Sequence, residues 1–432
     1  MIDIRLLRSD PDGTRSALGR RGVLPEEIDA LLEADGRALV AARRRDEARS
    51  EVRALSRRVA EARRGGDDAL AAELQLRSRA EGERISGLEA EAAAAGAERR
   101  ERLLVLPNLP SHEAPEGSSA EDNVVLRAWT PPGRDGYPPH QRVPHWEVGA
   151  ELGILDLERG AKLSGSMFPL FRGAGARLVR ALTALALDRH SDAFEEIRPP
   201  TLVRTATMVS TGHLPKFADD AYHLERDDLW AIPTAEVPLT SLARDEVLEE
   251  SELPRRMTAA TSCFRREAGA AGRDTRGLLR VHEFDKVELF AYCTPDQSGD
   301  VHDDLLSRAE SLLRDLGLQY RVLDLCAGDL GSSACRTFDL EAYAPGTDQW
   351  LEVSSVSWFS DYQARRANVR YRPAAGGPPS FVHTVNGSAM AWPRVWAALV
   401  ESGRLADGSL AVPEALLPWM GGVTTITAPA GR

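Results

Sequence analysis

A long stretch without proline most constrains what this chain can fold into. From Glu26 to about Leu106 the sequence is rich in Ala, Arg, Glu and Leu, and no proline interrupts it after Pro25. Apolar residues recur there at alternating steps of four and three, at Ala48, Val52, Leu55, Val59 and Ala62. Such a heptad seam predicts a long helix that packs along a second helix.

The turn that ends this helix is predicted within RRGGDDA, from Arg63 to Ala69. Two glycines allow a tight turn, and the aspartates that follow can cap the start of a new helix. A second apolar stripe follows the turn, at Leu74, Ile85, Leu88, Ala92 and Ala95. Two long helices joined by a tight turn run antiparallel, so the sequence predicts a helical hairpin.

The first of these helices is basic in an acidic chain. The chain has 54 Lys and Arg against 66 Asp and Glu, which argues against nonspecific polyanion binding by the whole surface. Between Arg37 and Arg64, however, ten Arg face four acidic residues, over a helix length of about 42 Å. The helix is either a dimerisation rod with solvated charges or a contact for the phosphates of a large nucleic acid. The candidate phosphate contacts are Arg43, Arg44, Arg45, Arg53, Arg57 and Arg58.

Two further features indicate the cellular location of the protein and the state of its cysteines. The N-terminus, MIDIRLLRSD, is charged, and no stretch approaches the roughly 20 apolar residues of a membrane span, so we expect a cytoplasmic protein without a membrane segment. The four cysteines show no C-x-x-C spacing. Neither a disulfide framework nor a zinc site of cysteines is therefore indicated, and buried thiols are expected.

The second half of the chain has a different pattern. Residues 106–123 are dense in Pro, Gly, Ser and Asn and are typical of a linker. GARLVRALTALALDRH has helical spacing, whereas RPPTLV and AIPTAEVPLT are predicted as strand edges broken by proline. Strands without regular alternation with helices favour an antiparallel sheet on which helices pack, an α+β class.

A loop with four arginines, CFRREAGAAGRDTRG from Cys263 to Gly277, precedes a predicted strand, LLRVHEFDKVELFAY. Alternation would place Phe284, Lys286 and Glu288 on one face of that strand, together with Arg280 and His282. Guanidinium groups, a carboxylate and a flat ring can bind triphosphate oxygens, an ammonium group and a base. No G-x-x-x-x-G-K-[ST] or G-x-G-x-x-G motif is present. A surface salt-bridge network is the alternative.

Three ordered motifs resemble those of seryl-tRNA synthetases, which are class II aminoacyl-tRNA synthetases. GARLVRALTALALDRHSDAFEEIRPPTLV resembles motif 1, with Pro200 at the proline usually found at the dimer interface. FRREAGAAGRDTRGLLRVHEFDKVE resembles motif 2, and HTVNGSAMAWPR resembles motif 3, which ends in Arg394. TGHLPKF, IPTAEVPL and DYQARR extend the resemblance, which runs essentially from end to end of the chain.

The resemblance implies an N-terminal antiparallel coiled-coil arm that binds tRNA, at residues 1–110. A class II antiparallel β-sheet catalytic domain flanked by helices would follow at residues 111–432 and would bind ATP and serine and form a homodimer. The implied enzyme is a serine–tRNA ligase that uses ATP, Mg²⁺ and L-serine, without zinc, and transfers the seryl group to tRNA(Ser). Transfer to tRNA(Sec) as well is left open.

The resemblance also assigns site residues. Arg265, Arg394 and Glu352 would be catalytic: Arg265 would hold the α-phosphate and the serine carboxylate, and Arg394 would cover the γ-phosphate. The implied ATP-binding residues are Arg265, Arg266, Glu267, Val281, Phe284, Glu352, Val353, Ser354, Ser355 and Arg394. The implied serine-binding residues are Thr234, Ala235, Glu236, Arg265, Glu288, Asn386 and Ser388. Glu352 and Ser355 would bind Mg²⁺, and Arg273 and Arg276 would meet pyrophosphate or the acceptor end of the tRNA.

Several residues depart from the usual family pattern near these motifs. Met167 stands where arginine is common, His213 where glutamine is common, and Trp358 where a small or polar residue is usual. Trp392 and Pro393 precede Arg394 in place of a small residue and glycine, which puts the aim of Arg394 in question. We therefore expect a divergent but active enzyme, with a second, inhibitor-resistant or biosynthetic copy as one hypothesis.

Two other functions remain open at this stage. One is an enzyme that activates an amino acid and loads a carrier protein or small acceptor. The other is a noncatalytic RNA-binding paralogue. Replacement of the arm arginines separates the first from a tRNA ligase, because it should weaken tRNA charging and leave carrier loading untouched.

Overall fold

The computed structural model describes residues 1–268 and 276–429 of the chain. These form two compact units. The helical arm is Ile4–Leu106, which falls within the predicted arm, and the sheet unit is Met1–Asp3 with Pro107–Arg432. The limits of the functional domains, 1–110 and 111–432, stay a prediction.

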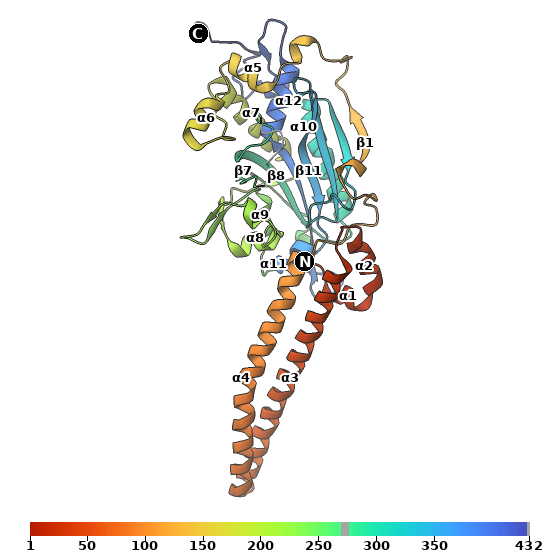
Figure 1. The fold of residues 1–432 in the computed structure, drawn as a ribbon, viewed down its shortest axis with the longest axis vertical. Helices are drawn as coiled ribbons and strands as arrows, with labels where there is room; N and C mark the ends of the chain where they lie inside the picture. The colour runs from red at the N-terminus through yellow and green to blue at the C-terminus, as the bar shows by residue number, and fades with distance from the viewer. Residues whose placement is uncertain (269–275, 430–432) are drawn as a thin grey trace. The chain divides into compact units, whose positions relative to one another are not determined.

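The helical arm is built on two long helices that run side by side (Figure 1). Gly66 takes a φ of +76° in the turn between them, and Asp67 caps the second helix by accepting a hydrogen bond from the backbone N of Leu70 at 3.0 Å. Ala48, Leu55 and Ala62 are buried along the predicted seam, whereas Val52 and Val59 are half-buried. The helical hairpin is thus confirmed. The helices of the arm are α1 (Ile4–Ser9), α2 (Pro11–Gly19), α3 (Pro25–Arg64) and α4 (Asp68–Val105).

The sheet unit is organised around an eight-stranded, mostly antiparallel sheet, in the order β1-β9-β10-β11-β14-β8-β7-β2. Only the short pairing of β2 with β7 is parallel. The predicted antiparallel sheet is therefore confirmed. Its strands are β1 (Val124–Trp129), β2 (Glu195–Glu196), β7 (Arg255–Phe264), β8 (Glu283–Cys293), β9 (Tyr320–Asp324), β10 (Arg336–Ala344), β11 (Gln349–Trp358) and β14 (His383–Ala391).

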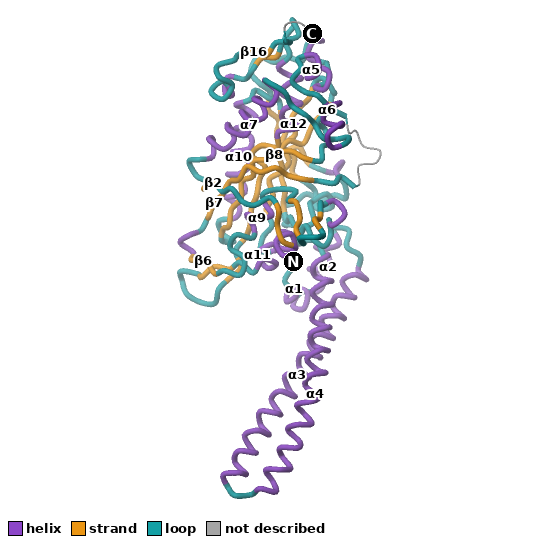
Figure 2. Tube along the Cα trace, turned by 90° about the vertical axis from the view of Figure 1, so that its left-hand side faces the viewer, coloured by secondary structure: helices purple, strands orange, loops and turns teal. Residues whose placement is uncertain are grey.

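Helices α7, α10 and α12 pack on this sheet, as Figure 2 shows beside its strands. The predicted helix at 175–190 is α7, and it buries Leu178, Leu182, Leu185 and Ala186 in the main core. The helices of the unit are α5 (His145–Glu151), α6 (Leu157–Ser164), α7 (Ala174–His190), α8 (Thr205–Thr211), α9 (Glu236–Thr240), α10 (Ser298–Asp315), α11 (Tyr362–Ala367) and α12 (Trp392–Gly403).

Smaller elements complete the unit. The minor sheets contain β3 (Leu202–Arg204), β4 (His223–Leu224), β5 (Leu229–Ala231), β6 (Val247–Glu249), β12 (Arg370–Arg372), β13 (Ser380–Phe381), β15 (Leu410–Ala411) and β16 (Thr425–Ile426). Short 3₁₀ turns lie at Ala120–Asp122, Pro139–Gln141, Ala218–Asp220, Glu250–Glu252 and Glu414–Leu416.

Two predicted strands differ from the structure. The strand after the arginine loop does not start at Leu278: β8 starts at Glu283, because the backbone N of Leu278 donates to His145 Nε2 at 2.9 Å and that of His282 to the Met167 carbonyl at 3.0 Å. In AIPTAEVPLT, only the first part is a strand. β5 ends at Ala231, and Glu236–Thr240 forms the fully buried helix α9.

Two expectations from composition can be compared with the structure. All four cysteines are buried, as expected, and burial raises the pKa of Cys263 to about 11. Within residues 1–268 and 276–429, none of the helices has the length and apolar character of a membrane crossing.

Candidate active site

Four neighbouring strands, β11, β14, β8 and β7, supply most of the predicted site residues. Arg265 follows the last residue of β7, and Phe284, Lys286 and Glu288 alternate along β8 opposite it. Glu352 lies on β11, and Asn386 and Ser388 lie on β14. Because strand periodicity is two, alternate residues of adjacent strands share one face, and this explains why residues far apart in sequence meet here.

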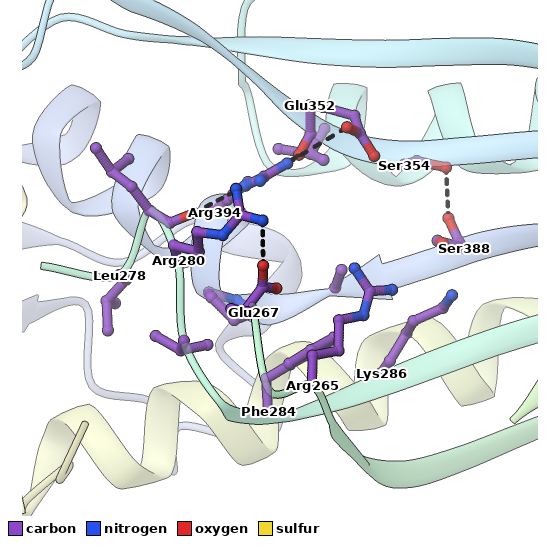
Figure 3. Close-up of a pocket in the computed structure, with 15 residues that line it drawn as sticks. Arg265, Glu267, Leu278, Arg280, Phe284, Lys286, Glu352, Ser354, Ser388 and Arg394 are labelled. Atoms are coloured by element: carbon purple, nitrogen blue, oxygen red, sulfur yellow. Dashed lines mark hydrogen bonds and ion pairs between the residues drawn. The ribbon is translucent and has the colours of Figure 1, made fainter. Parts of the chain in front are cut away.

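The first cavity lies at the end of the β7–β8 hairpin (Figure 3). It contains every predicted ATP-binding residue except Arg266 and Ser355. Its lining residues are Arg265, Glu267, Leu278, Leu279, Arg280, Val281, Phe284, Lys286, Glu352, Val353, Ser354, Ser388, Ala391, Pro393 and Arg394.

The arginines of this cavity are held in defined positions. The backbone N of Arg265 donates to the His282 carbonyl at 2.9 Å, and its guanidinium carbon lies 5.2 Å from the centre of the Phe284 ring. Arg280 forms an ion pair with Glu267, which has a φ of +53°. Figure 3 shows this pair beside Arg394. Fixed guanidinium groups around an open space suit a polyanionic ligand.

Pro393 is compatible with the helix that carries Arg394. The proline lies in the first turn of α12, where a helix needs no backbone N–H, so the ring costs no hydrogen bond. Arg394 donates from Nη1 to the Glu352 carbonyl at 2.9 Å and from Nε to the Leu279 carbonyl at 3.2 Å. Trp392 is buried and packs edge to face on Phe171 at 4.9 Å. Trp392 and Pro393 are therefore both accommodated at the start of the helix that carries Arg394.

The second cavity adjoins the first and contains the predicted serine-binding residues Thr234, Glu236, Arg265, Asn386 and Ser388. Burial, and next the charge of Glu288, raise the pKa of Glu236 to about 7. Gln363 opposes this shift by donating from Nε2 to Glu236 Oε1 at 2.6 Å. The second cavity therefore holds a carboxyl that can change its charge near neutral pH.

Lys286 links the carboxylate of Glu288 to the wall of the second cavity. Its Nζ lies 2.5 Å from Glu288 Oε2 and donates to Thr234 Oγ1 at 3.0 Å, and Thr234 donates to the same Glu288 oxygen at 3.1 Å. Glu288 is fully buried, and its other oxygen, Oε1, has no hydrogen-bond partner among the described residues. An orphaned buried acceptor favours a ligand that brings a donor.

Arg265, Lys286 and Ser388 line both cavities. The two cavities therefore meet at a guanidinium and an ammonium group. A ligand with negative charge at the junction would be stabilised from both sides.

The residues predicted to hold a cation fit a divalent metal ion. Glu352 and Ser355 lie on β11, and Ser355 pairs across the sheet with Asp339 on β10. Burial, and next the charge of Glu352, raise the pKa of Asp339 well above its ordinary value. Asp339 Oδ1 is buried without a partner in the described part of the chain. The oxygens of these carboxyl groups are hard ligands, and a bound cation would offset the repulsion between their negative charges, so the pair suits Mg²⁺. The described residues contain no group of three His, Cys, Asp or Glu that would form a metal site by itself.

Some predicted residues lie outside the cavities. Arg266 faces Tyr222, with its guanidinium carbon 6.0 Å from that ring, and Ala235 is fully buried behind the wall. Ser355 lines the second cavity instead of the first. Arg273 lies outside the described residues.

Three residues at or beside these cavities were given no role in the site from the sequence: Lys286, Arg280 and Gln363. Alternation did place the first two on the same strand face as Phe284 and Glu288. Gln363 lies on α11, and its Oε1 accepts a hydrogen bond from Thr384 at 2.7 Å. No spacing in the sequence relates it to Glu236.

The six predicted phosphate contacts all lie on α3, and they differ in their surroundings. Arg43, Arg44 and Arg45 have carboxylate partners, Glu47, Glu91 and Asp46 respectively. Arg53, Arg57 and Arg58 have none within the described ranges. The exposed and unpaired guanidinium groups are the ones most free to bind an external anion.

Two family patterns match this chain. Residues 1–110 match the seryl-tRNA synthetase N-terminal domain, and residues 221–403 match the tRNA synthetase class II core domain (G, H, P, S and T). The serine–tRNA ligase of Gemmatimonas aurantiaca is 50% identical over 98% of this chain and 99% of its own length. That of Nitratidesulfovibrio vulgaris is 45% identical over 99% of this chain and its full length.

The fold is also similar to that of a solved structure. The seryl-tRNA synthetase from Pyrococcus horikoshii, which was crystallised in complex with ATP, has a TM-score of 0.89 and 33% sequence identity. The match covers 99% of this chain and 100% of that one.

Proposed function

This chain belongs to the seryl-tRNA synthetase family, and we propose that the two adjoining cavities of its sheet unit bind the substrates of a serine–tRNA ligase reaction. Its activity is that of an aminoacyl-tRNA synthetase. L-serine reacts with ATP to give seryl-adenylate and pyrophosphate, and the seryl group then passes to tRNA(Ser) with release of AMP.

One observation carries the assignment of substrates to cavities: Arg265 lines both. Activation requires the serine carboxylate to attack the α-phosphate of ATP, so both groups must lie beside the same positive charge. We assign adenine to the ring of Phe284, the α-phosphate to Arg265 and the γ-phosphate to Arg394. The forked donors of arginine suit phosphate oxygens at each position.

We assign serine to the second cavity. Its hydroxyl or ammonium group would supply a donor to the buried carboxyl of Glu236, with Thr234, Asn386 and Ser388 around it, and Glu288 would act from behind this wall through Lys286 and Thr234. Alanine lacks the hydroxyl and would leave a buried acceptor unpaired, which is a strong basis for rejection.

We also propose that Glu352 and Ser355 hold Mg²⁺, with Asp339 beside them. When bound, the ion would neutralise phosphate charge. Arg394 would position Glu352 for this role by donating a hydrogen bond to its carbonyl.

The other candidate functions are not favoured. Relatives that match along nearly the whole chain are serine–tRNA ligases, which argues against loading of a carrier protein. The orphaned buried acceptors of Glu288 and Asp339 argue against a noncatalytic paralogue, because empty polar pockets are costly without a ligand. We propose action in the cytoplasm, with tRNA(Sec) as a further acceptor where the host has one.

Arg265→Ala tests the assignment. We expect the variant to lower the kcat/KM of serine-dependent ATP–pyrophosphate exchange by about 10²–10³, because it removes a preorganised cation at the reacting phosphorus. Arg372→Ala, an exposed arginine on β12 outside both cavities, is the matched control. Full exchange in Arg265→Ala would contradict the assignment, and absence of serine-dependent exchange in the folded wild type would remove the proposed function.

The hypothesis of a second, inhibitor-resistant copy stays a prediction. Titration of the same exchange reaction with a nonhydrolysable seryl-adenylate analogue, beside a relative with the usual motifs, gives the comparison that it needs.

A further inference from the structure

A third cavity opens beside the two described above. On one side it is lined by Met208, His213 and Phe217, and on the other by Arg265, Glu352 and Arg394. His213 and Phe217 also line the second cavity. They therefore stand where the proposed serine site opens toward the reacting phosphate, and neither has a role in the activation step described above.

His213 presents one free ring nitrogen to this opening. Thr211 Oγ1 lies 3.1 Å from the Met208 carbonyl, to which it can donate, and 2.7 Å from His213 Nδ1. With the hydroxyl hydrogen on that carbonyl, Nδ1 carries the imidazole hydrogen and Nε2 carries a lone pair. Nε2 makes no hydrogen bond to any described residue.

The charge state agrees with this geometry. Burial, and next the charges of Arg265, Lys286 and Arg366, lower the pKa of His213 to about 3. The imidazole is therefore neutral in the physiological range and acts as a hydrogen-bond acceptor. Such a weak base orients a hydroxyl group without keeping its proton.

Phe217 adds an accessible flat surface next to this acceptor. Its side chain is 39% exposed, and its ring centre lies 6.4 Å from that of His213. The segment is also tied to the start of the arginine loop. Asp220 accepts from the backbone N of Arg266 at 2.8 Å through its carbonyl and from that of Ala268 at 2.9 Å through its side chain.

The remaining substrate of the proposed reaction matches this surface. A single-stranded nucleotide end offers a base that stacks on an aromatic ring and ribose hydroxyls that donate hydrogen bonds. ATP and serine already have their own partners in the first two cavities. We propose that Phe217 and His213 position the 3′-terminal nucleotide of the tRNA, with its base on the Phe217 ring and a ribose hydroxyl donating to His213 Nε2. This inference rests on the proposed function, and both residues are positioning residues for seryl transfer.

The test separates transfer from activation in the full-length enzyme. ATP–pyrophosphate exchange needs no tRNA, whereas single-turnover transfer from enzyme-bound seryl-adenylate to tRNA(Ser) needs the terminal nucleotide. We expect His213→Leu to slow transfer about tenfold, the effect of one lost hydrogen bond in a closed site, and to leave exchange unchanged. His213→Gln should restore transfer, because the amide oxygen can accept the same hydrogen bond.

Phe217→Ala should raise the tRNA concentration that gives half-maximal transfer by about tenfold, because one stacking contact is lost. Leu405→Ala is its control, since Leu405 is equally exposed, at 39%, and lies outside the three cavities. The ratio of wild-type to His213→Leu transfer rates should stay constant between pH 6 and pH 8, because His213 does not titrate there.

Equal losses of exchange and transfer in His213→Leu, unchanged transfer, or a raised serine KM in exchange would overturn the inference. In each case a wild type that charges tRNA(Ser) leaves the proposed function standing. A folded wild type that performs neither reaction would instead remove the proposed function itself.

Discussion

Glu236 links substrate binding to protonation at the scale of a single residue. The residue is 8% exposed and faces the charge of Glu288, and among the described residues Gln363 and Asn386 offer hydrogen bonds against that cost. An ionised carboxylate in this position is expensive until a ligand supplies a donor. A ligand that donates a hydrogen bond to this carboxyl group would therefore offset part of its desolvation cost.

Glu236→Gln should become more stable relative to the wild type as the pH rises. The folded pKa, about 7, is above the unfolded value of 4.5, so the folded wild type holds the proton more tightly. The stability that this proton contributes is complete below about pH 4.5 and is lost as the pH passes through 7. At 1.36 kcal/mol per pKa unit the difference reaches about 3 kcal/mol.

Denaturant unfolding of both proteins at pH 5 and pH 8 measures this change. Glu249→Gln, which replaces an exposed carboxylate on β6, serves as the control. A stability difference between Glu236→Gln and the wild type that is equal at both pH values would contradict the pKa shift.

Site residues that belong to a sequence motif could be predicted, whereas residues that only the fold brings to the site could not. Arg265 and Phe284 come from the stretch that resembles motif 2 and Arg394 from the one that resembles motif 3, and all three line one cavity. Asp339 and Gln363 reach the site through the pairing of β10 with β11 and through the packing of α11. Tertiary contacts of this kind leave no periodic signal in a single sequence.

At the scale of elements, local patterns succeeded where the solvent defines one face. The heptad steps of α3 and the four apolar positions of α7 each mark the buried side of an otherwise polar helix. The predictions for the start of β8 and for the segment that forms α9 were wrong, because contacts with residues distant in sequence determine both structures. Leu278 is held by His145, and α9 is buried on all sides, so neither shows the expected alternation.

The basic side of α3 gives a test of the arm. Arg57→Ala combined with Arg58→Ala removes two unpaired guanidinium groups, so we expect weaker tRNA charging and a log–log salt dependence that is less steep by about two units. ATP–pyrophosphate exchange should be unchanged, because neither residue lines a cavity of the sheet unit.

Arg49→Ala is the matched control on the same helix. Its guanidinium lies 2.5 Å from Glu89 of α4, so it is already neutralised within the arm. Equal effects of the control and the double variant on charging would show that overall charge, and not unpaired arginines, governs the contact.

At the scale of the whole molecule, charge and apolar surface are unevenly distributed. The net charge of −12 keeps most of the surface unattractive to nucleic acid, so a cluster of arginines on one helix can act locally. The sheet also has an edge strand, β1, that hydrogen-bonds only to β9 among the described strands. Val124, Val125 and Leu126 on that strand are 44%, 49% and 44% exposed. Natural sheets protect or cover such edges.

We therefore expect a homodimer, and β1 is a candidate surface for the second copy in addition to the segment of Pro200, which the resemblance assigns to the dimer interface. Val124→Lys combined with Leu126→Lys adds two charges to this strand and should shift the protein from twice its 47.1 kDa chain mass toward the single-chain mass. Light scattering coupled to gel filtration measures this shift. Val247→Lys, an equally exposed valine on β6 at 44%, controls for the added charge on a strand. A wild type that stays monomeric at micromolar concentration while charging tRNA would contradict the dimer. A dimer unaffected by the double substitution would move the interface away from β1.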